Sequence, residues 1–186
     1  MSARIGFAGE IHNAAHKGDL KAIERLSSHG ADLNELAASG DTALITSILA
    51  GHSAVARLLI ERGADIHARN LGGFTPLHAA AYSGRTDLLP LLISNSTDIN
   101  DQKNKAGVSP LTVAAEEGQF EAVKRLIELG ADLEAAEQNG YTALTRALWR
   151  GHSAVVAELQ SSGAKCQPVE VLEEPTFSVC MANQRQ

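Results

Sequence analysis

Apolar residues recur along this chain with the period of an amphipathic helix, in short segments separated by loops. One such face, after Ser53, is formed by Val55, Ala56, Leu59 and Ile60. The same face recurs as Leu88, Leu89, Leu92 and Ile93, and again as Ala122, Val123, Leu126 and Ile127. These segments are near or below the ~12–15 residues at which an isolated helix becomes marginal in water. The pattern therefore predicts short helices that are stabilised by stacking on one another.

A shorter apolar segment precedes each of these helices, for example residues 75–82. At helical spacing, the side that we expect to be buried carries Leu77, Ala80 and Ala81. The opposite side, which we expect to point away from the core, carries Ala79, Tyr82 and Ser83. Each unit of the pattern is thus predicted to contain a helix, a turn, a second helix and a loop.

Glycines and capping residues mark the boundaries of these units. The glycines that close the shorter helices are Gly18, Gly51, Gly84, Gly118 and Gly151, so the period is 33 residues with one extra residue in a single unit. A period of this length indicates a repeat array. A threonine or serine begins the shorter helix, and Pro76 and Pro110 stand just inside it, where the missing N–H would be unpaired anyway.

The segment from Thr75 to Ala80 carries the complete signature Thr-Pro-Leu-His-x-Ala, and Gly-Ala-Asp follows the second helix at Gly30, Gly63 and Gly130. Together with the period, these residues resemble the ankyrin-repeat family. The resemblance implies an all-α fold, an ankyrin-repeat solenoid of five helix-turn-helix units with projecting loops. The fold serves many unrelated partners, so the resemblance says less about function.

The resemblance also assigns roles to individual polar residues. His12 and His78 fall at the signature histidine, which in the family ties the loop to the helix by hydrogen bonds. His52 and His152 follow the mid-unit glycine, and we interpret them as structural too. Asn34 and Asn100 match a loop asparagine that is hydroxylated in some ankyrin proteins, and the sequence leaves open whether either is modified.

We expect three parts in the chain. Residues 1–6 form an N-terminal extension and residues 7–166 the repeat domain, with units at about 7–37, 38–70, 71–104, 105–138 and 139–166. Residues 167–186 form a C-terminal tail with two open interpretations. It is either a disordered terminus, or a segment whose Val171, Leu172 and Phe177 fold back onto the last repeat or present a binding motif.

Four positions depart from the interior pattern. Ser27 and Gln160 stand in the first and last units where interior units carry isoleucine, as expected of capping repeats. Pro90 lies inside a predicted second helix, where proline is unfavourable. Asn95 or Ser96 must take the conformation of a missing glycine in the same unit. We expect the array to be least rigid between the third and fourth units.

Composition narrows the class of partner. The net charge is -6 and the pI is near 5.6, which gives no basic footprint for nucleic acid or an anionic membrane. No segment reaches the roughly 18 apolar residues of a membrane span. Cys166 and Cys180 lack metal-ligand spacing, and we expect two reduced thiols in a reducing compartment. These features predict a soluble, cytoplasmic monomer with no nucleic-acid or membrane partner.

Candidate catalytic patterns have structural explanations. His12 and His16 stand four residues apart, but Asn13 occupies the place where a zinc protease has glutamate. Glu116 and Glu117 are neighbours on a helix and do not face one another. The chain also lacks a P-loop, a Rossmann glycine pattern and a nucleophile elbow. We predict no catalytic residues, no metal and no cofactor.

The aromatic residues are the most informative candidates for binding. Phe74 and Tyr141 stand between the loop glycine and the capping threonine, and Tyr82 and Trp149 stand at the end of the first helix. In ankyrin-like arrays these positions line the concave groove. Exposed Trp and Tyr are enriched in binding hot spots. The remaining candidates at these positions are Lys17, Leu49, Ser83, Glu116, Glu117 and Arg150.

The leading hypothesis is a non-enzymatic protein–protein interaction module, an adaptor, scaffold or regulator that binds a partner protein through the concave groove. A partner with exposed apolar side chains flanked by lysine or arginine would suit the groove. An alternative is a subunit of a complex assembled through the C-terminal tail. A ligand-binding or enzymatic module is the third class.

Overall fold

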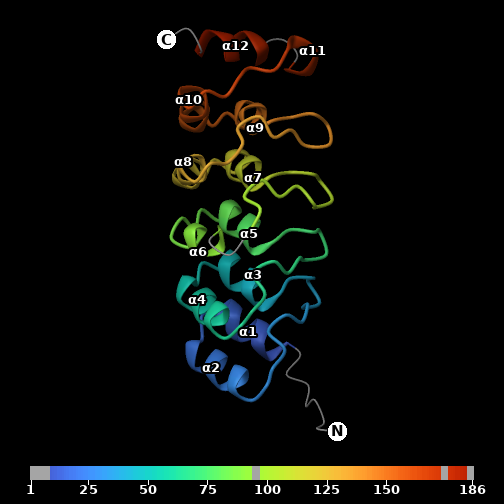
Figure 1. Cartoon of the computed structure of the whole chain (residues 1–186), viewed down its shortest axis with the longest axis vertical. Helices are drawn as coiled ribbons and strands as arrows, with labels where there is room; N and C mark the ends of the chain where they lie inside the picture. Colours follow the sequence, from blue (N-terminus) through green and yellow to red (C-terminus); the bar gives the residue numbers. More distant parts are fainter. Residues whose placement is uncertain (1–8, 94–96, 173–175, 184–186) are drawn as a thin grey trace. The chain divides into compact units, whose positions relative to one another are not determined.

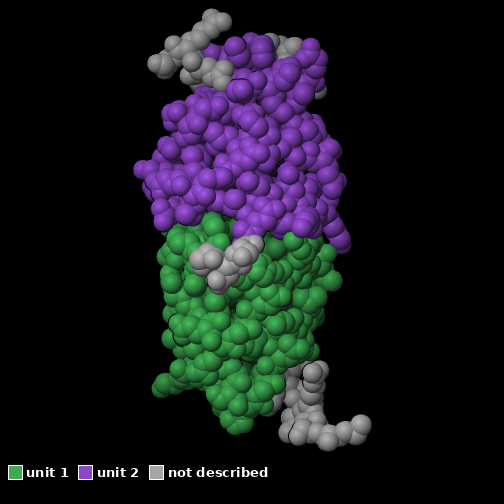
Figure 2. Space-filling view, in the orientation of Figure 1, with its two compact units in different colours: residues 1–95 green, residues 96–186 purple. Residues whose placement is uncertain are grey.

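A computed structural model describes residues 9–93, 97–172 and 176–183. Within these ranges the chain consists of helices joined by turns and loops, and contains no strand. It divides into two compact units, residues 1–95 and residues 96–186 (Figure 2). The predicted all-α repeat fold is confirmed. The predicted extension at residues 1–6 lies outside the described residues, and the repeat boundaries stay a prediction.

The helices follow one another as pairs along each unit (Figure 1). The first unit contains α1 (Glu10–Lys17), α2 (Leu20–Ser28), α3 (Ala43–Leu49), α4 (Ser53–Glu61), α5 (Pro76–Tyr82) and α6 (Leu89–Ile93). The second unit contains α7 (Pro110–Glu116), α8 (Phe120–Glu128), α9 (Ala143–Arg150), α10 (Ser153–Ser161), α11 (Val169–Leu172) and α12 (Thr176–Asn183). Helix α3 packs against α1, α4 and α5, and α9 packs against α7, α10 and α12.

Hydroxyl side chains start the first helix of several repeats, as the sequence predicts. The Thr42 hydroxyl accepts a hydrogen bond from the Ile45 N–H at 3.2 Å, and the Ser109 hydroxyl accepts one from the Thr112 N–H, also at 3.2 Å. In α5 the N–H of the N-cap residue Thr75 donates to His78 Nδ1 at 3.3 Å, and the Thr75 hydroxyl lies 2.9 Å from the same nitrogen. Together these contacts form a capping box. Such caps satisfy N–H groups that have no partner within the helix.

Small and branched apolar side chains fill the space between the helices. On the first helices the fully buried residues include Leu44, Ile48, Leu77, Leu111 and Leu144, and on the second helices Ile23, Val55, Leu59, Leu92, Val123 and Leu159. Ile60, Ile93 and Ile127 are half-buried, at the edge of the apolar face. Leu77, Ala80 and Ala81 of α5 are buried, as predicted. Ala79, which we expected to point away from the core, is also buried at 6% exposure, because other elements pack on α5 beyond its apolar face.

Helix α6 is five residues long, whereas α2, α4, α8 and α10 each have nine. Pro90 is its second residue, so the N–H that proline lacks belongs to the first turn and would have no intrahelical partner. The chain thus accommodates this proline by beginning the helix later. The prediction that Asn95 or Ser96 takes the conformation of a missing glycine cannot be compared with the structure, because residues 94–96 lie outside the described residues.

Histidines join a helix to the loop of the same repeat, as His12 does, or one repeat to the next, as His52 and His152 do. His12 Nε2 is 2.9 Å from the Glu35 carbonyl oxygen, and His52 Nε2 is 3.0 Å from that of His16. His152 Nε2 makes the equivalent contact with the Glu116 carbonyl oxygen at 2.9 Å. These distances confirm the structural role that the sequence predicts for these histidines.

Side chains in the loops also connect one repeat to the next. Asn34 Oδ1 accepts a hydrogen bond from the Asp65 N–H at 2.8 Å, and Asn100 Oδ1 accepts one from the Asp132 N–H at 2.9 Å. Glu134 Oε1 accepts one from the Lys165 N–H at 2.9 Å. At these three junctions a loop is therefore held by the loop of the next repeat, with glutamate in place of asparagine at the last one.

After the last repeat the chain continues as α11 and α12, which the sequence did not predict. Leu172, one of the residues proposed to fold back, is 1% exposed, whereas Val171 and Phe177 are half-buried. Gln167 anchors the segment, because its Nε2 donates to the Gly140 carbonyl oxygen at 2.6 Å and its Oε1 accepts hydrogen bonds from Thr142 and Thr145. The described part of the tail is therefore helical and packed on the last repeat.

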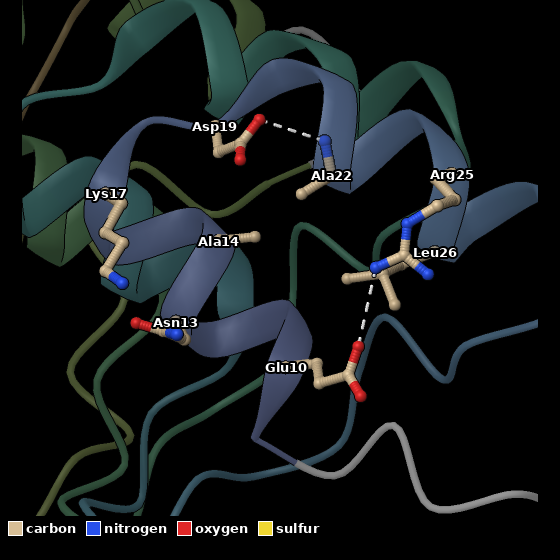
Figure 3. A pocket seen from close by; sticks show the side chains of 8 residues that line it. All are labelled: Glu10, Asn13, Ala14, Lys17, Asp19, Ala22, Arg25 and Leu26. Atoms are coloured by element: carbon tan, nitrogen blue, oxygen red, sulfur yellow. Dashed lines mark hydrogen bonds and ion pairs between the residues drawn. The ribbon is translucent and has the colours of Figure 1, made fainter.

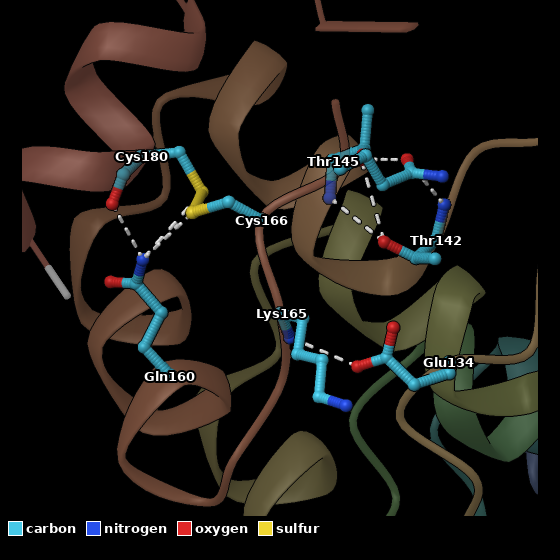
Figure 4. Close-up of a disulfide and its surroundings, with 8 residues drawn as sticks. Glu134, Thr142, Thr145, Gln160, Lys165, Cys166 and Cys180 are labelled. Atoms are coloured by element: carbon cyan, nitrogen blue, oxygen red, sulfur yellow. Dashed lines mark hydrogen bonds between the residues drawn. A yellow bond between two sulfur atoms is a disulfide. The ribbon is translucent and has the colours of Figure 1, made fainter. Parts of the chain in front are cut away.

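Cys166 and Cys180 form a disulfide, with their Cα atoms 5.9 Å apart (Figure 4). The prediction of two reduced thiols is therefore wrong for this structure. Sequence spacing could not reveal the pair, because the cysteines are 14 positions apart in the chain and their approach depends on tertiary contacts.

Candidate partner-binding site

The position two residues before the mid-unit glycine is exposed in several repeats. In the first unit it is occupied by Leu49 on α3, which is 42% exposed, and by Tyr82 on α5, which is 50% exposed. Because α3 and α5 pack against one another, these equivalent positions lie on neighbouring helices. In the second unit the same position carries Glu116 on α7 and Trp149 on α9, which also pack together.

Trp149 is the centre of a cluster in the second unit. Its side chain is 42% exposed, and its ring meets the ring of Tyr141 edge to face, with centroids 4.4 Å apart. Tyr141 reaches this place from the end of the preceding loop, where its carbonyl oxygen accepts the Glu137 N–H and so closes the loop. The cluster is thus built from one helix and the loop that leads into it.

Arg146, one turn before Trp149 on α9, joins the rings to the acidic residues. Its guanidinium lies 5.5 Å from the Tyr141 ring centroid and 5.9 Å from that of Trp149. It also donates to Glu137 Oε1 at 2.5 Å and lies 3.7 Å from Glu116 Oε1. The Glu137 side chain is 1% exposed, so this carboxylate depends on Arg146 for its counter-charge.

Arg150 forms a second ion pair with Glu116, at 2.7 Å. This hydrogen bond and the charge of the Glu116 carboxylate raise the pKa of the Arg150 guanidinium, and the nearby charge of Glu117 acts in the same direction. Glu117 is exposed and makes no ion pair within the described part of the chain. Of the two adjacent glutamates, Glu116 is therefore held by arginines while Glu117 remains available.

The predicted residues of the first unit have other surroundings. The Phe74 ring is half-buried and meets the His78 ring edge to face, with centroids 5.5 Å apart. The Ser83 hydroxyl donates to the Ala79 carbonyl oxygen at 2.7 Å and contacts that of Ile48 at 3.4 Å. Phe74 thus packs within its own repeat and Ser83 contacts the preceding one, whereas Leu49 and Tyr82 expose apolar surface.

Lys17 lies at the end of α1 and lines a small mixed pocket (Figure 3). An ion pair between Glu10 and Arg25, 3.5 Å apart, stands at another side of this pocket. The Asp19 carboxylate accepts the Ala22 N–H at 3.0 Å, which makes it a helix cap. Glu10, Asp19 and Arg25 thus already have structural partners, and Lys17 is the remaining charged residue of the pocket.

The structure therefore brings four predicted residues together: Glu116, Tyr141, Trp149 and Arg150. Glu117 stands beside them, and the other five, Lys17, Leu49, Phe74, Tyr82 and Ser83, belong to the first unit. One groove containing all ten stays a prediction. Arg146 and Glu137 are central to the cluster and were missed. The spacing of Arg146 to Trp149 and Arg150 on one helix, at i+3 and i+4, is the signal that could have found Arg146.

No group of three or more His, Cys, Asp and Glu side chains suited to a metal ion occurs among the described residues. None of the helices in the described ranges combines the length and the apolar character needed to cross a bilayer. The arrangement instead offers an aromatic surface held in place by ion pairs, together with an exposed carboxylate.

Comparisons with known proteins agree with the repeat architecture. A family model described as ankyrin repeats (3 copies) matches residues 11–103 and 86–169. A region of the 60 kDa lysophospholipase of Mus musculus is 49% identical over 148 residues, which are 80% of this chain and 26% of that protein. A transient receptor potential cation channel subfamily A member 1 homolog of Caenorhabditis elegans is 26% identical over 173 residues, or 93% of this chain and 14% of that protein. The chain thus spans about a quarter or less of these relatives.

Proposed function

Because this chain belongs to the ankyrin-repeat family, whose repeats generally mediate protein–protein interaction, we propose that it binds a partner protein and performs no chemistry of its own. The observation that carries this proposal is the exposed ring of Trp149, held in place by Tyr141 and Arg146. A rigid, partly exposed tryptophan supplies large contact area with little loss of side-chain entropy on binding. The proposed activity is that of an adaptor, scaffold or regulator.

The charges around Trp149 favour a particular kind of partner segment. Both arginines of the cluster are already paired with carboxylates, whereas Glu117 is exposed and has no ion pair within the described residues. A lysine or arginine of the partner could pair with Glu117 while an apolar neighbour packs on Trp149. We therefore propose a partner whose apolar residues are flanked by basic ones.

The test compares proteins retained by the wild-type chain and by a Tyr82→Ala/Trp149→Ala double variant, followed by calorimetric titration of each purified candidate. We expect at least one partner whose affinity falls by about 10-fold or more, as for truncated hot-spot residues. Leu20→Ala is the matched control, because Leu20 is 41% exposed but lies on α2, outside the proposed surface. Equal binding by the double variant, or loss of its helical circular dichroism, contradicts the proposal.

A second candidate function comes from the relative that is 49% identical to this chain, a lysophospholipase. The matched region is 26% of that protein and 80% of this chain, and so overlaps the repeats matched at residues 11–169. Under this candidate the repeats accompany a lysophospholipase activity as a binding or regulatory region. We expect the present chain to release no fatty acid from lysophosphatidylcholine, and measurable turnover would overturn the non-enzymatic assignment.

We also propose that the chain is a cytoplasmic monomer. Light scattering coupled to size exclusion should then give a mass near 19.6 kDa. Cytosolic thiol buffers keep most protein cysteines reduced. At a cytoplasmic location the Cys166–Cys180 pair would therefore be expected mostly in its reduced, dithiol form.

A further inference from the structure

The disulfide connects the last repeat to the helix that covers it. Cys166 follows the turn at Gly163 that ends α10, and Cys180 lies on α12 (Figure 4). Cys180 is 0% exposed, whereas Cys166 is half-buried. Cys166 is therefore the cysteine of the pair that is partly exposed to solvent.

Within the described residues, helix α12 packs against α9 and α11 and buries little of its own surface. It has eight residues, a length at which an isolated helix is unstable in water. Cys180 is its only fully buried residue among those whose side chains are described, and Val179 is 51% exposed. A cross-link between residues 14 apart removes much of the chain entropy that would otherwise favour release.

Gln160 stands beside the disulfide on α10. Interior repeats carry an isoleucine at this position, such as Ile60 on α4. Here the side-chain amide donates to the Cys180 carbonyl oxygen at 3.0 Å and approaches both sulfurs, at 3.7 Å for Cys166 and 3.6 Å for Cys180 (Figure 4). The polar residue that the sequence suggested as an end cap is thus turned toward the sulfur atoms.

The other end of this amide lacks a hydrogen-bond partner. Gln160 Oε1 is buried and accepts no hydrogen bond from the described residues. A buried acceptor without a donor is unfavourable, and the disulfide has no hydrogen to donate. A thiol S–H, formed if the disulfide is reduced, is a donor of the kind that this oxygen lacks.

We propose that Cys166 and Cys180 form a thiol–disulfide exchange site, and that its reduction by a dithiol releases α12 from the last repeat. This inference is independent of the proposed partner surface. It goes beyond a structural cross-link because the site combines a partly exposed cysteine, Cys166, with an amide N–H donor beside the buried sulfur of Cys180.

The exchange proceeds in two displacements. A thiolate of the reductant attacks Cys166 Sγ, the Sγ–Sγ bond breaks, and its electron pair passes to Cys180 Sγ, where the Gln160 N–H stabilises the thiolate before it takes up a proton. The second thiol of the reductant then attacks, as a thiolate, the reductant sulfur that is bonded to Cys166, and the Cys166 thiolate leaves and takes up a proton. The protein gains two thiols, and the dithiol becomes a disulfide.

Hydrogen exchange of the full chain tests the release. Samples are compared before and after dithiothreitol treatment, with the thiols counted by N-ethylmaleimide labelling and intact mass. We expect amides of residues 176–183 to exchange at least about 10-fold faster after reduction, with α7–α10 unchanged. Equal protection of α12 in both states, or two labelled thiols before treatment, overturns the proposal.

Variants separate the cross-link from the fold of the helix. Cys180→Ser under oxidising conditions should reproduce the fast exchange of α12, whereas Val179→Ser, at the exposed neighbouring position, should keep the slow exchange of the wild type. Loss of protection throughout α9 and α10 in Cys180→Ser would overturn the inference, because the disulfide would then hold the repeat itself.

Gln160→Ile tests the amide, since it installs the residue of the interior repeats. We expect its disulfide to be reduced by dithiothreitol about 3- to 10-fold more slowly at neutral pH, because the leaving thiolate loses a hydrogen-bond donor. The slower rate should persist when α12 protection in the oxidised state equals that of the wild type. An unchanged or faster rate overturns the role assigned to Gln160.

Discussion

His152 Nε2 lies 2.9 Å from the carbonyl oxygen of Glu116, one repeat earlier in the chain. The imidazole ring consequently covers Gly118, where an added Cβ would be 2.7 Å from His152 Nδ1. In the same way, a Cβ added at Gly18 in the first repeat would lie 2.7 Å from His52 Nδ1 in the second. The glycine that ends a first helix is therefore required by the next repeat as well as by its own backbone.

Gly118→Ala should destabilise the protein by about 2–4 kcal/mol, the sum of left-handed backbone strain and overpacking against His152. The control is Gly130→Ala, because Gly130 has φ +90 but no atom within 4 Å of an added Cβ. Backbone strain alone should then cost about 1–2 kcal/mol. Urea unfolding measures both free energies, and equal losses would show that the imidazole contact is unimportant.

Arg146→Leu should cost about 3–5 kcal/mol of unfolding free energy, because it leaves the buried Glu137 carboxylate without its counter-charge. Arg57→Leu is the matched control, since Arg57 pairs with Asp87 at 3.3 Å and both side chains are nearly half exposed. Such an exposed pair contributes about 0–1 kcal/mol. Thermal and urea unfolding should separate the variants, and similar losses in both would contradict the buried ion pair.

Asn100→Ala should destabilise the second unit by about 0.5–1.5 kcal/mol, because the Asp132 N–H loses its acceptor. Hydrogen exchange should show faster exchange at this amide in particular. Asn139→Ala, at an exposed loop position, is the control and should change stability by less than about 0.5 kcal/mol. An unaltered Asp132 amide in Asn100→Ala would exclude a role for the loop-to-loop bond.

Amides of α6 should exchange at least about 10-fold faster than those of α4 and α8, because α6 begins later after its mid-unit glycine than those helices and so lacks their first turn. Mass-spectrometric exchange at peptide resolution is sufficient to compare them. Equal protection of the three helices would contradict this expectation and the predicted low rigidity between the third and fourth units.

The sequence predicted those features that depend on residues close together in the chain. Thr42 and Ser109 cap their helices as expected, and Leu77 is buried, because helical periodicity and capping are local properties. Ala79 was misassigned because a helix covered on several sides has no simple outer face. The periodic pattern alone does not show how far neighbouring elements extend around it.

The candidate site was predicted less completely. Tyr141 and Trp149 were identified as residues that the repeat pattern does not require, but their mutual contact was not. Glu137 and Arg146 were missed because their ion pair joins a loop to a helix, and a buried carboxylate cannot be told from an exposed one by residue type. The disulfide was missed for a similar reason, since it depends on how α12 packs against the last repeat.

The covering of Gly18, Gly51 and Gly118 by a side chain of the next repeat limits how such an array can change. Arg85 occupies in the third repeat the position that His52 occupies in the second, and its guanidinium lies where a side chain at Gly51 would stand. A larger residue at Gly51 would therefore have to displace the end of the Arg85 side chain, which is flexible, whereas at Gly118 it would meet the ring of His152. A duplicated or deleted repeat must likewise match its new neighbour. Packing is therefore preserved when the residues on both sides of a junction between repeats are kept together.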